Sequence, residues 1–254
     1  MEKINLTELN PGGERTALIL EGWATNTSLY IGLAETVAEL GYRVFLPDLP
    51  GFGASPEPPE AWNCADYAAF VNRFLEDRGV ERVTLIGHSH GGRVILKAIG
   101  ESLLSAKTER VVLIGSAGIV REKTERQIRA AKRYRIAAKL LSVCPQLLEA
   151  YRRAKGSEDY RNASPIMRGT LVRCINEDLR QLLPNIAVPT LLLYGERDAD
   201  TPPENGRLMA SLIPDAGFVL VPHAGHYAHL DNPEFVNRVL RSFLLPPLTN
   251  NKTE

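Results

Sequence analysis

Ser89 lies at the centre of a Gly-x-Ser-x-Gly sequence, residues 87–91, between the apolar run 83–86 and a stretch of helical periodicity, 91–99. A serine hydroxyl attacks a carbonyl carbon once a neighbouring base has removed its proton. Glycines on both sides of a serine let a strand and a helix pass close together and leave the hydroxyl exposed. Free N–H groups at the start of that helix would stabilise negative charge on a substrate. A glycine-rich turn without chemistry has the same pattern, so the prediction of a nucleophile needs partner residues.

A general base for Ser89 is expected among the histidines. All five fall in two segments: His88 and His90 flank Ser89, and the other three lie within 223–229. The turn holds the two flanking rings too tightly for them to act on Ser89, although the His90 N–H remains a donor. His226 is the predicted base, because the glycine before it frees its loop to present the ring. We expect at least one of the other two histidines of that loop to have only a structural role.

The carboxylate that orients the base is expected after the apolar run 190–194. Asp198 lies three residues past Gly195, in the predicted turn that leaves this strand. A carboxylate there would hold His226 in the correct tautomer and stabilise its charged form. Asp200 is less favoured, because it precedes Thr-Pro and would serve equally well as a turn or helix-start residue.

Short apolar runs alternate with longer amphipathic stretches along most of the chain, as in strands joined by crossover helices. The predicted strands are 16–20, 42–46, 83–86, 111–114, 190–194 and 218–221. The predicted helices are 29–40, 65–78, 91–99, 203–213 and 233–244. The expected fold class is α/β, with a mostly parallel central sheet flanked by helices. Because parallel strands end at one edge of a sheet, Ser89, Asp198 and His226 are expected to meet there.

Residues 119–183 break this alternation, since they show helical periodicity and no convincing strand. We therefore expect a helical insertion at 119–183 between two parts of one core, 1–118 and 184–254. Its first half is basic: the range 121–155 holds eleven Lys or Arg against three Glu. The simpler interpretation is a solvated outer helix face. The alternative is a lid whose positive field attracts acidic substrates or a lipid surface.

The composition excludes several classes of protein. Thirty basic and thirty acidic residues cancel over 254 residues, so nucleic-acid binding is not expected. The chain shows neither a secretory leader nor an apolar run of membrane-spanning length, which favours a cytoplasmic protein. Three scattered cysteines suit neither a disulfide framework nor a thiolate metal cluster. We expect no cofactor and no metal ion.

The order Ser89, Asp198, His226 is the point at which a family becomes recognisable. With this order and its strand context, the chain resembles the α/β-hydrolase superfamily over nearly its whole length, apart from the insertion. The segments 46–55 and 232–234 also resemble the family's sequences. The resemblance implies a serine-nucleophile, esterase-like hydrolase. It further implies that the insertion is a cap over a mostly apolar pocket, with a small-molecule substrate that has an apolar portion.

The chain departs from the family at the end of the first central strand. The family usually has His-Gly there, whereas this chain has Glu21 followed by Gly22 and Trp23. By the resemblance, the backbone N–H groups of Trp23 and His90 would form the oxyanion hole. A backbone donor does not depend on the side chain, so Glu21 need not abolish the hole, although it could reorganise the loop. Trp23 could instead be a pocket-wall aromatic.

The favoured function is hydrolysis of a carboxylic ester through an acyl-enzyme on Ser89. Thioester, amide and carbon–carbon bond cleavage use the same three residues in this superfamily and stay open. A serine rather than an aspartate at position 89 argues against epoxide hydrolase and haloalkane dehalogenase chemistry. The rival from another class is a ligand-binding or receptor protein of the same fold with little turnover, and Glu21 keeps that rival open.

Overall fold

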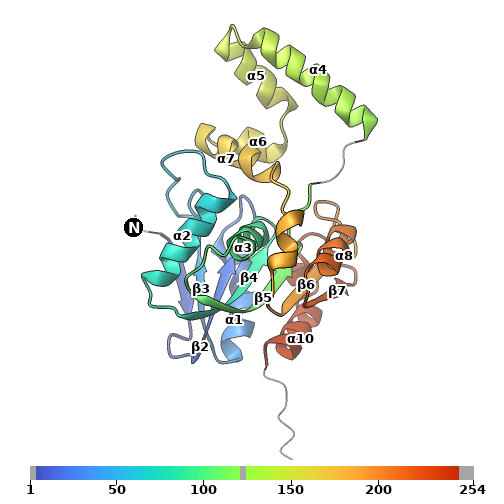
Figure 1. Ribbon diagram of the computed structural model, residues 1–254. Coiled ribbons are helices and arrows are strands. Elements are labelled where there is room, and N and C mark those ends of the chain that lie inside the picture. Colours follow the sequence, from blue (N-terminus) through green and yellow to red (C-terminus); the bar gives the residue numbers. More distant parts are fainter. Residues whose placement is uncertain (1–3, 121–123, 246–254) are drawn as a thin grey trace, which may run out of the picture.

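Seven strands form one twisted sheet at the centre of the molecule (Figure 1). The computed structural model describes residues 4–120 and 124–245. The order across the sheet is β1-β3-β2-β4-β5-β6-β7, and every neighbouring pair is parallel except β1 with β3. The strands are β1 (Leu6–Leu9), β2 (Arg15–Leu20), β3 (Tyr42–Pro47), β4 (Arg82–His88), β5 (Lys107–Ile114), β6 (Thr190–Gly195) and β7 (Ala216–Val221). The predicted α/β fold with a mostly parallel sheet is confirmed.

All six predicted strands are present, and the structure adds β1, which was not predicted. This edge strand pairs antiparallel with β3, with Leu6 opposite Pro47 and Leu9 opposite Val44. Its four residues are mostly half-buried and include no fully buried side chain. Such a strand lacks the compact apolar run that identifies the central strands.

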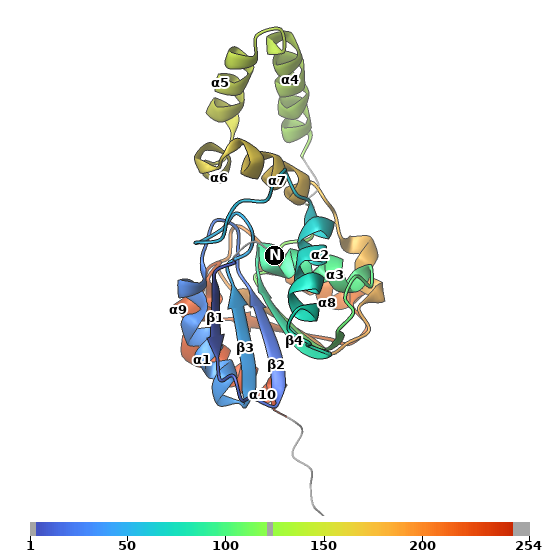
Figure 2. The same cartoon turned by 90° about the vertical axis from the view of Figure 1, so that its left-hand side faces the viewer.

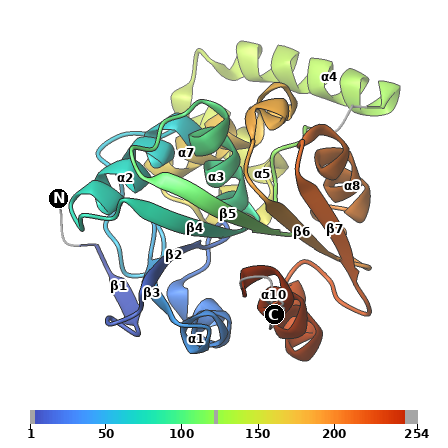
Figure 3. The ribbon, with the colours of Figure 1, turned by 60° about the horizontal axis from the view of Figure 1, so that its bottom comes forward.

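Helices cover both faces of the sheet, as Figures 1 and 3 show. On one face, α2, α3 and α8 contribute Phe74, Val94 and Met209 to the larger apolar cluster. On the other face, α1 and α10 contribute Val37 and Leu240 to the second cluster. These helices are α1 (Ile31–Glu39), α2 (Cys64–Glu76), α3 (His90–Gly100), α8 (Pro203–Leu212) and α10 (Pro233–Leu244), with the short helices η1 (Thr27–Tyr30) and α9 (Ala228–Asp231). Both faces of the sheet are therefore dry, which explains the continuous apolar strands.

Four α-helices of the described chain lie between β5 and β6, within the predicted insertion. They are α4 (Glu125–Leu141), α5 (Pro145–Lys155), α6 (Glu158–Asn162) and α7 (Pro165–Ile175). Helices α6 and α7 lie over the carboxyl edge of the sheet, whereas α4 and α5 form a hairpin that projects away from it (Figures 1 and 2). The chain rejoins the core at Leu179, whose N–H donates to the Gly118 carbonyl, and η2 (Arg180–Asn185) then packs against α3. The boundaries of a separate cap domain, 119–183, stay a prediction.

Among the described residues, no helix combines the length and the apolar character that crossing a lipid bilayer requires.

Candidate active site

Ser89 occupies a sharp turn between β4 and α3. Its backbone has φ 48° and ψ −107°, a left-handed conformation that residues other than glycine rarely adopt. A side chain at Gly87 would come within 2.6 Å of the Gly92 nitrogen, and one at Gly91 would collide with the Leu20 carbonyl oxygen. The close approach of backbone therefore requires glycine at both positions, which agrees with the predicted close passage of strand and helix.

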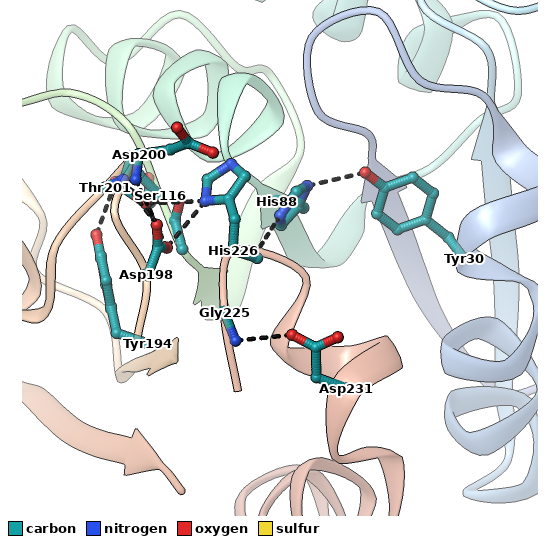
Figure 4. Close-up of polar contacts among 11 residues, drawn as sticks. Tyr30, His88, Ser116, Tyr194, Asp198, Asp200, Thr201, Gly225, His226 and Asp231 are labelled. Atoms are coloured by element: carbon teal, nitrogen blue, oxygen red, sulfur yellow. Dashed lines mark hydrogen bonds and ion pairs between the residues drawn. The ribbon is translucent and has the colours of Figure 1, made fainter. Parts of the chain in front are cut away.

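Asp198 and His226 are in direct contact (Figure 4). The Nδ1 atom of His226 lies 2.9 Å from Oδ2 of Asp198. The Thr201 hydroxyl donates to the same oxygen at 2.8 Å, and the N–H groups of Asp200 and Thr201 donate to Oδ1 at 2.9 Å. Burial by itself would raise the pKa of Asp198, but these hydrogen bonds outweigh it and hold the pKa below its usual value. Asp198 is therefore ionised at neutral pH and accepts the Nδ1 proton of His226.

The other predicted site residues line one cleft, which has a volume of about 400 Å³. Ser89, His226, Trp23 and His90 all line it, and Asp198 lies buried behind His226. Within the described part of the chain, no hydrogen bond joins the Ser89 hydroxyl to the His226 ring. In unliganded enzymes such bonds are often long and tighten when substrate binds.

The two residues predicted to form an oxyanion hole border this cleft on the side of β2. His90 is the first residue of α3, where an N–H has no partner within the helix. Over residues 4–120 and 124–245, no acceptor is bonded to the N–H of Trp23 or of His90. The Trp23 ring packs against Phe52, with ring centroids 4.9 Å apart, and against the ring of His90. Trp23 is thus a wall of the cleft as well as a candidate donor.

Glu21, the residue at which the chain departs from its family, is fully buried and does not line the cleft. Its Oε1 accepts the Leu49 N–H at 2.7 Å, and its carbonyl oxygen accepts the Gly91 N–H at 2.9 Å. Burial raises the pKa of Glu21 to about 9, and the nearby charge of Asp48 adds to the rise. At neutral pH Glu21 is therefore an uncharged acid that ties the end of β2 to the loop after β3 and to the start of α3.

His88 connects the two sides of the site. Its Nδ1 lies 2.9 Å from the Tyr30 hydroxyl, and its Nε2 lies 3.0 Å from the His226 carbonyl oxygen. Burial lowers the pKa of His88, so the ring is neutral and carries one N–H. That N–H must be on Nε2, since a carbonyl can only accept, and Nδ1 therefore accepts from Tyr30. Tyr30 in turn accepts the Gly22 N–H at 2.8 Å, so a chain of hydrogen bonds runs from the Glu21-Gly22-Trp23 loop to the backbone of His226.

The two remaining histidines of the 223–229 loop stay outside the cleft. His223 is exposed and lies beside Glu196. His229 is buried and stacks on the Tyr30 ring, with centroids 5.0 Å apart. Neither lines the cleft, which agrees with the expectation that at least one is structural.

Three further residues of the site were not predicted. Thr201 supports Asp198, and an Asp followed three residues later by Thr is a turn pattern that could have indicated it. Arg93 lines the cleft, and its guanidinium donates to the carbonyl oxygens of Cys174 and Glu177, which ties the end of α7 to α3. No local pattern predicts Tyr30, because its partner His88 is 58 residues away.

Asp198, Asp200 and His226 also have ligand atoms within 4.8 Å of one another, close enough to hold a cation. Both oxygens of Asp198 are already acceptors, however, and His226 uses Nδ1 for its bond to Asp198. A metal ion there would have to displace these hydrogen bonds, so the donor set fits an Asp-His pair better than a metal centre.

The family-level comparison covers most of the chain. The model of one family, described as the alpha/beta hydrolase fold, matches residues 18–233. The chain belongs to this family. The match includes all of the residues that form the site described above and the insertion as well.

Individual relatives of this α/β hydrolase are distant. A pimeloyl-[acyl-carrier protein] methyl ester esterase of Nitrosomonas europaea is 25% identical over 85% of this chain and 90% of its own. A 2-hydroxy-6-oxo-6-(2'-aminophenyl)hexa-2,4-dienoic acid hydrolase of Metapseudomonas resinovorans is 26% identical over 80% of this chain and 74% of its own. Among solved structures, an esterase from Exiguobacterium antarcticum superposes with a TM-score of 0.73 at 22% identity, covering 95% of both chains. That structure supports the fold alone.

Proposed function

We propose that the protein is a serine hydrolase that cleaves a carboxylic ester of a small molecule through an acyl-enzyme on Ser89. The observation that carries the proposal is the ionised Asp198, hydrogen-bonded to a histidine that lines the same cleft as a serine on a sharp strand-to-helix turn. This combination supplies a nucleophile, a base and a group that stabilises the charged base. The name of the Nitrosomonas europaea relative, a methyl ester esterase, supports an ester as the substrate.

The reaction proceeds in two halves. The Ser89 hydroxyl oxygen bonds to the ester carbonyl carbon while His226 takes the hydroxyl proton. Asp198 stabilises the imidazolium that forms on His226. The electrons of the carbonyl double bond move onto the ester carbonyl oxygen, and the N–H groups of Trp23 and His90 stabilise the negative charge on that oxygen. The carbon–oxygen bond then breaks, and the alcohol leaves with the proton from His226. In the second half, His226 deprotonates water as the water oxygen attacks the acyl carbon. The bond between the acyl carbon and the Ser89 oxygen then breaks, His226 returns the proton to that oxygen, and the acid is released.

The lining of the cleft supports a small substrate that has an apolar portion. Its lining includes the apolar side chains of Trp23, Leu171 and Ile175, the last two on α7. A cleft of about 400 Å³ lies at the lower end of the usual range for small-molecule sites. Since α7 belongs to the insertion, the cap would determine which acyl or alcohol group fits.

The test is turnover of short p-nitrophenyl esters by the wild type and by Ser89→Ala. We expect an acyl-enzyme burst followed by steady turnover in the wild type, and loss of both in Ser89→Ala. Ser116→Ala is the matched control, because Ser116 is a buried serine near the turn whose hydroxyl donates to the Ala117 carbonyl oxygen. A wild type that reacts neither with esters nor with a fluorophosphonate probe would sink the enzyme proposal and favour the ligand-binding rival.

A further inference from the structure

The hairpin formed by α4 and α5 (residues 125–155) has a surface that combines exposed apolar side chains with many basic ones. The contacts that define it join α4 to α5, including the stacked rings of Tyr134 and Tyr151, whose centroids are 5.3 Å apart. Figures 1 and 2 show that the turn between the two helices is the part of the insertion farthest from the sheet. A hairpin so placed has little surface in contact with its own chain and is available to a partner.

The end of the hairpin is apolar. Leu140, Val143 and Leu147, at and beside the turn, expose 71%, 90% and 57% of their surface. Seven of the ten large apolar residues that are exposed in the described part of the chain lie between residues 125 and 175. Exposed apolar side chains gathered in this way mark an interaction surface.

The same hairpin is strongly basic. It holds nine Lys or Arg and two Glu, so the rest of this neutral chain has seven more acidic than basic residues. A groove of about 1030 Å³ between the hairpin and α7 is lined by five arginines, among them Arg135, Arg152 and Arg153. Within residues 4–120 and 124–245 these three have no carboxylate partner. Their charges are therefore available to an anionic ligand.

We propose that the hairpin docks this protein onto an anionic phospholipid bilayer. Val143 and its apolar neighbours would enter the boundary between headgroups and acyl chains, while the arginines of the groove and the other basic side chains contact lipid phosphates. An apolar end beside basic residues matches the two regions of a lipid surface, since the apolar side chains suit the acyl chains and the basic side chains suit the phosphate headgroups. Symmetric pairing of two hairpins would instead place one positive surface against another. The proposal does not depend on the reaction at Ser89.

The test is flotation of the full chain with phosphatidylcholine vesicles that contain phosphatidylglycerol, compared with phosphatidylcholine alone. We expect binding to the anionic vesicles that falls several-fold as salt is raised. Each of Arg135→Gln, Arg152→Gln and Arg153→Gln lowers the partition constant about five-fold, as loss of one charge near an anionic surface should. Val143→Asp lowers it at least about ten-fold, since a carboxylate is both desolvated and repelled.

Matched controls are available on the core. Leu208→Asp on α8 and Leu230→Asp on α9 change apolar residues that are 38% and 46% exposed, and Lys107→Gln removes a charge at the start of β5. All three should bind vesicles as the wild type does. Hydrolysis of a soluble ester and the circular dichroism spectrum verify folding, and Leu147→Asp replaces Val143→Asp if that variant fails to fold. Absence of binding to anionic vesicles, binding that ignores salt, equal losses in the controls, or a stable dimer that Val143→Asp dissociates would each overturn the proposal.

Discussion

Two buried carboxyl groups lie on opposite sides of Ser89, and their pKa values shift in opposite directions. Asp198, after β6, accepts hydrogen bonds from His226, Thr201 and the Asp200 N–H, and its pKa is lowered. Glu21, after β2, accepts one N–H from Leu49 in the part of the chain that is described, and its pKa rises to about 9. Burial favours the neutral form of both residues, so the larger supply of donors to Asp198 and the negative charge of Asp48 beside Glu21 account for the opposite shifts.

This difference in charge separates two roles. The ionised Asp198 can respond to a proton arriving on His226, because a full negative charge stabilises an imidazolium. The neutral Glu21 cannot do so, and it connects backbone segments around the Trp23 loop instead. A carboxyl group at the edge of an α/β sheet is thus not by itself a sign of catalysis.

The largest expected effect comes from removing the charge of Asp198. Asp198→Asn should lower kcat on a p-nitrophenyl ester by about 10⁴-fold, because the amide neither stabilises the imidazolium nor holds the correct tautomer. Asp200→Asn is the control, since Asp200 lines the same cleft, whereas the Nδ1 atom of His226 is bonded to Asp198. An equal loss of kcat in Asp200→Asn would contradict the assignment of Asp198.

Replacing Glu21 by a side chain that is always neutral should stabilise the protein, in contrast to the loss expected at Asp198. Its folded pKa of about 9 lies above the usual value of 4.5, so the wild type loses stability as pH rises from about 4.5 to about 9. Glu21→Gln stays neutral and should exceed the wild type in free energy of unfolding by about 5 kcal/mol at pH 8, with little difference near pH 4. Urea unfolding at both pH values measures this, with the exposed Glu35→Gln as control. A pH-independent difference would mean that Glu21 is ionised in the folded protein.

The Tyr30 hydroxyl connects the loop after β2 to His88 and so to the backbone of His226. Tyr30→Phe therefore tests whether this connection contributes to stability and to kcat. The variant leaves the Gly22 N–H and the Nδ1 of His88 without the hydroxyl, which should lower the free energy of unfolding by about 2 kcal/mol. It should also lower kcat, since the link to the His226 backbone is lost. Tyr42→Phe removes another buried hydroxyl, one that contacts Arg15 far from the cleft. If Tyr42→Phe lowers kcat as much, the effect is one of stability alone.

The smallest effect is expected from removing the Thr201 hydroxyl, which donates to Asp198. Thr201→Val removes one hydrogen bond to Oδ2, which should raise the pKa of Asp198 and lower kcat about ten-fold. Thr201→Ser keeps the hydroxyl and should restore most of the activity. The pH profile of kcat/KM separates this effect from a loss of fold, because a merely structural defect would leave the profile unshifted.

The sequence predicts what depends on local patterns. The six central strands have continuous apolar runs because both faces of the sheet are covered, and the positions of Ser89, Asp198 and His226 follow from where those strands end. The sequence does not predict the link from Tyr30 to His88 or the neutral state of Glu21. Both depend on side chains that meet only after folding, and on burial that no spacing in the chain reveals.

The left-handed backbone of Ser89 has a consequence for how this chain would change over evolutionary time. At φ 48° and ψ −107°, glycine would have lower energy than serine. The fold therefore holds the Ser89 side chain against a conformational preference of the backbone. A descendant that did not need the hydroxyl would gain stability by replacing Ser89 with glycine.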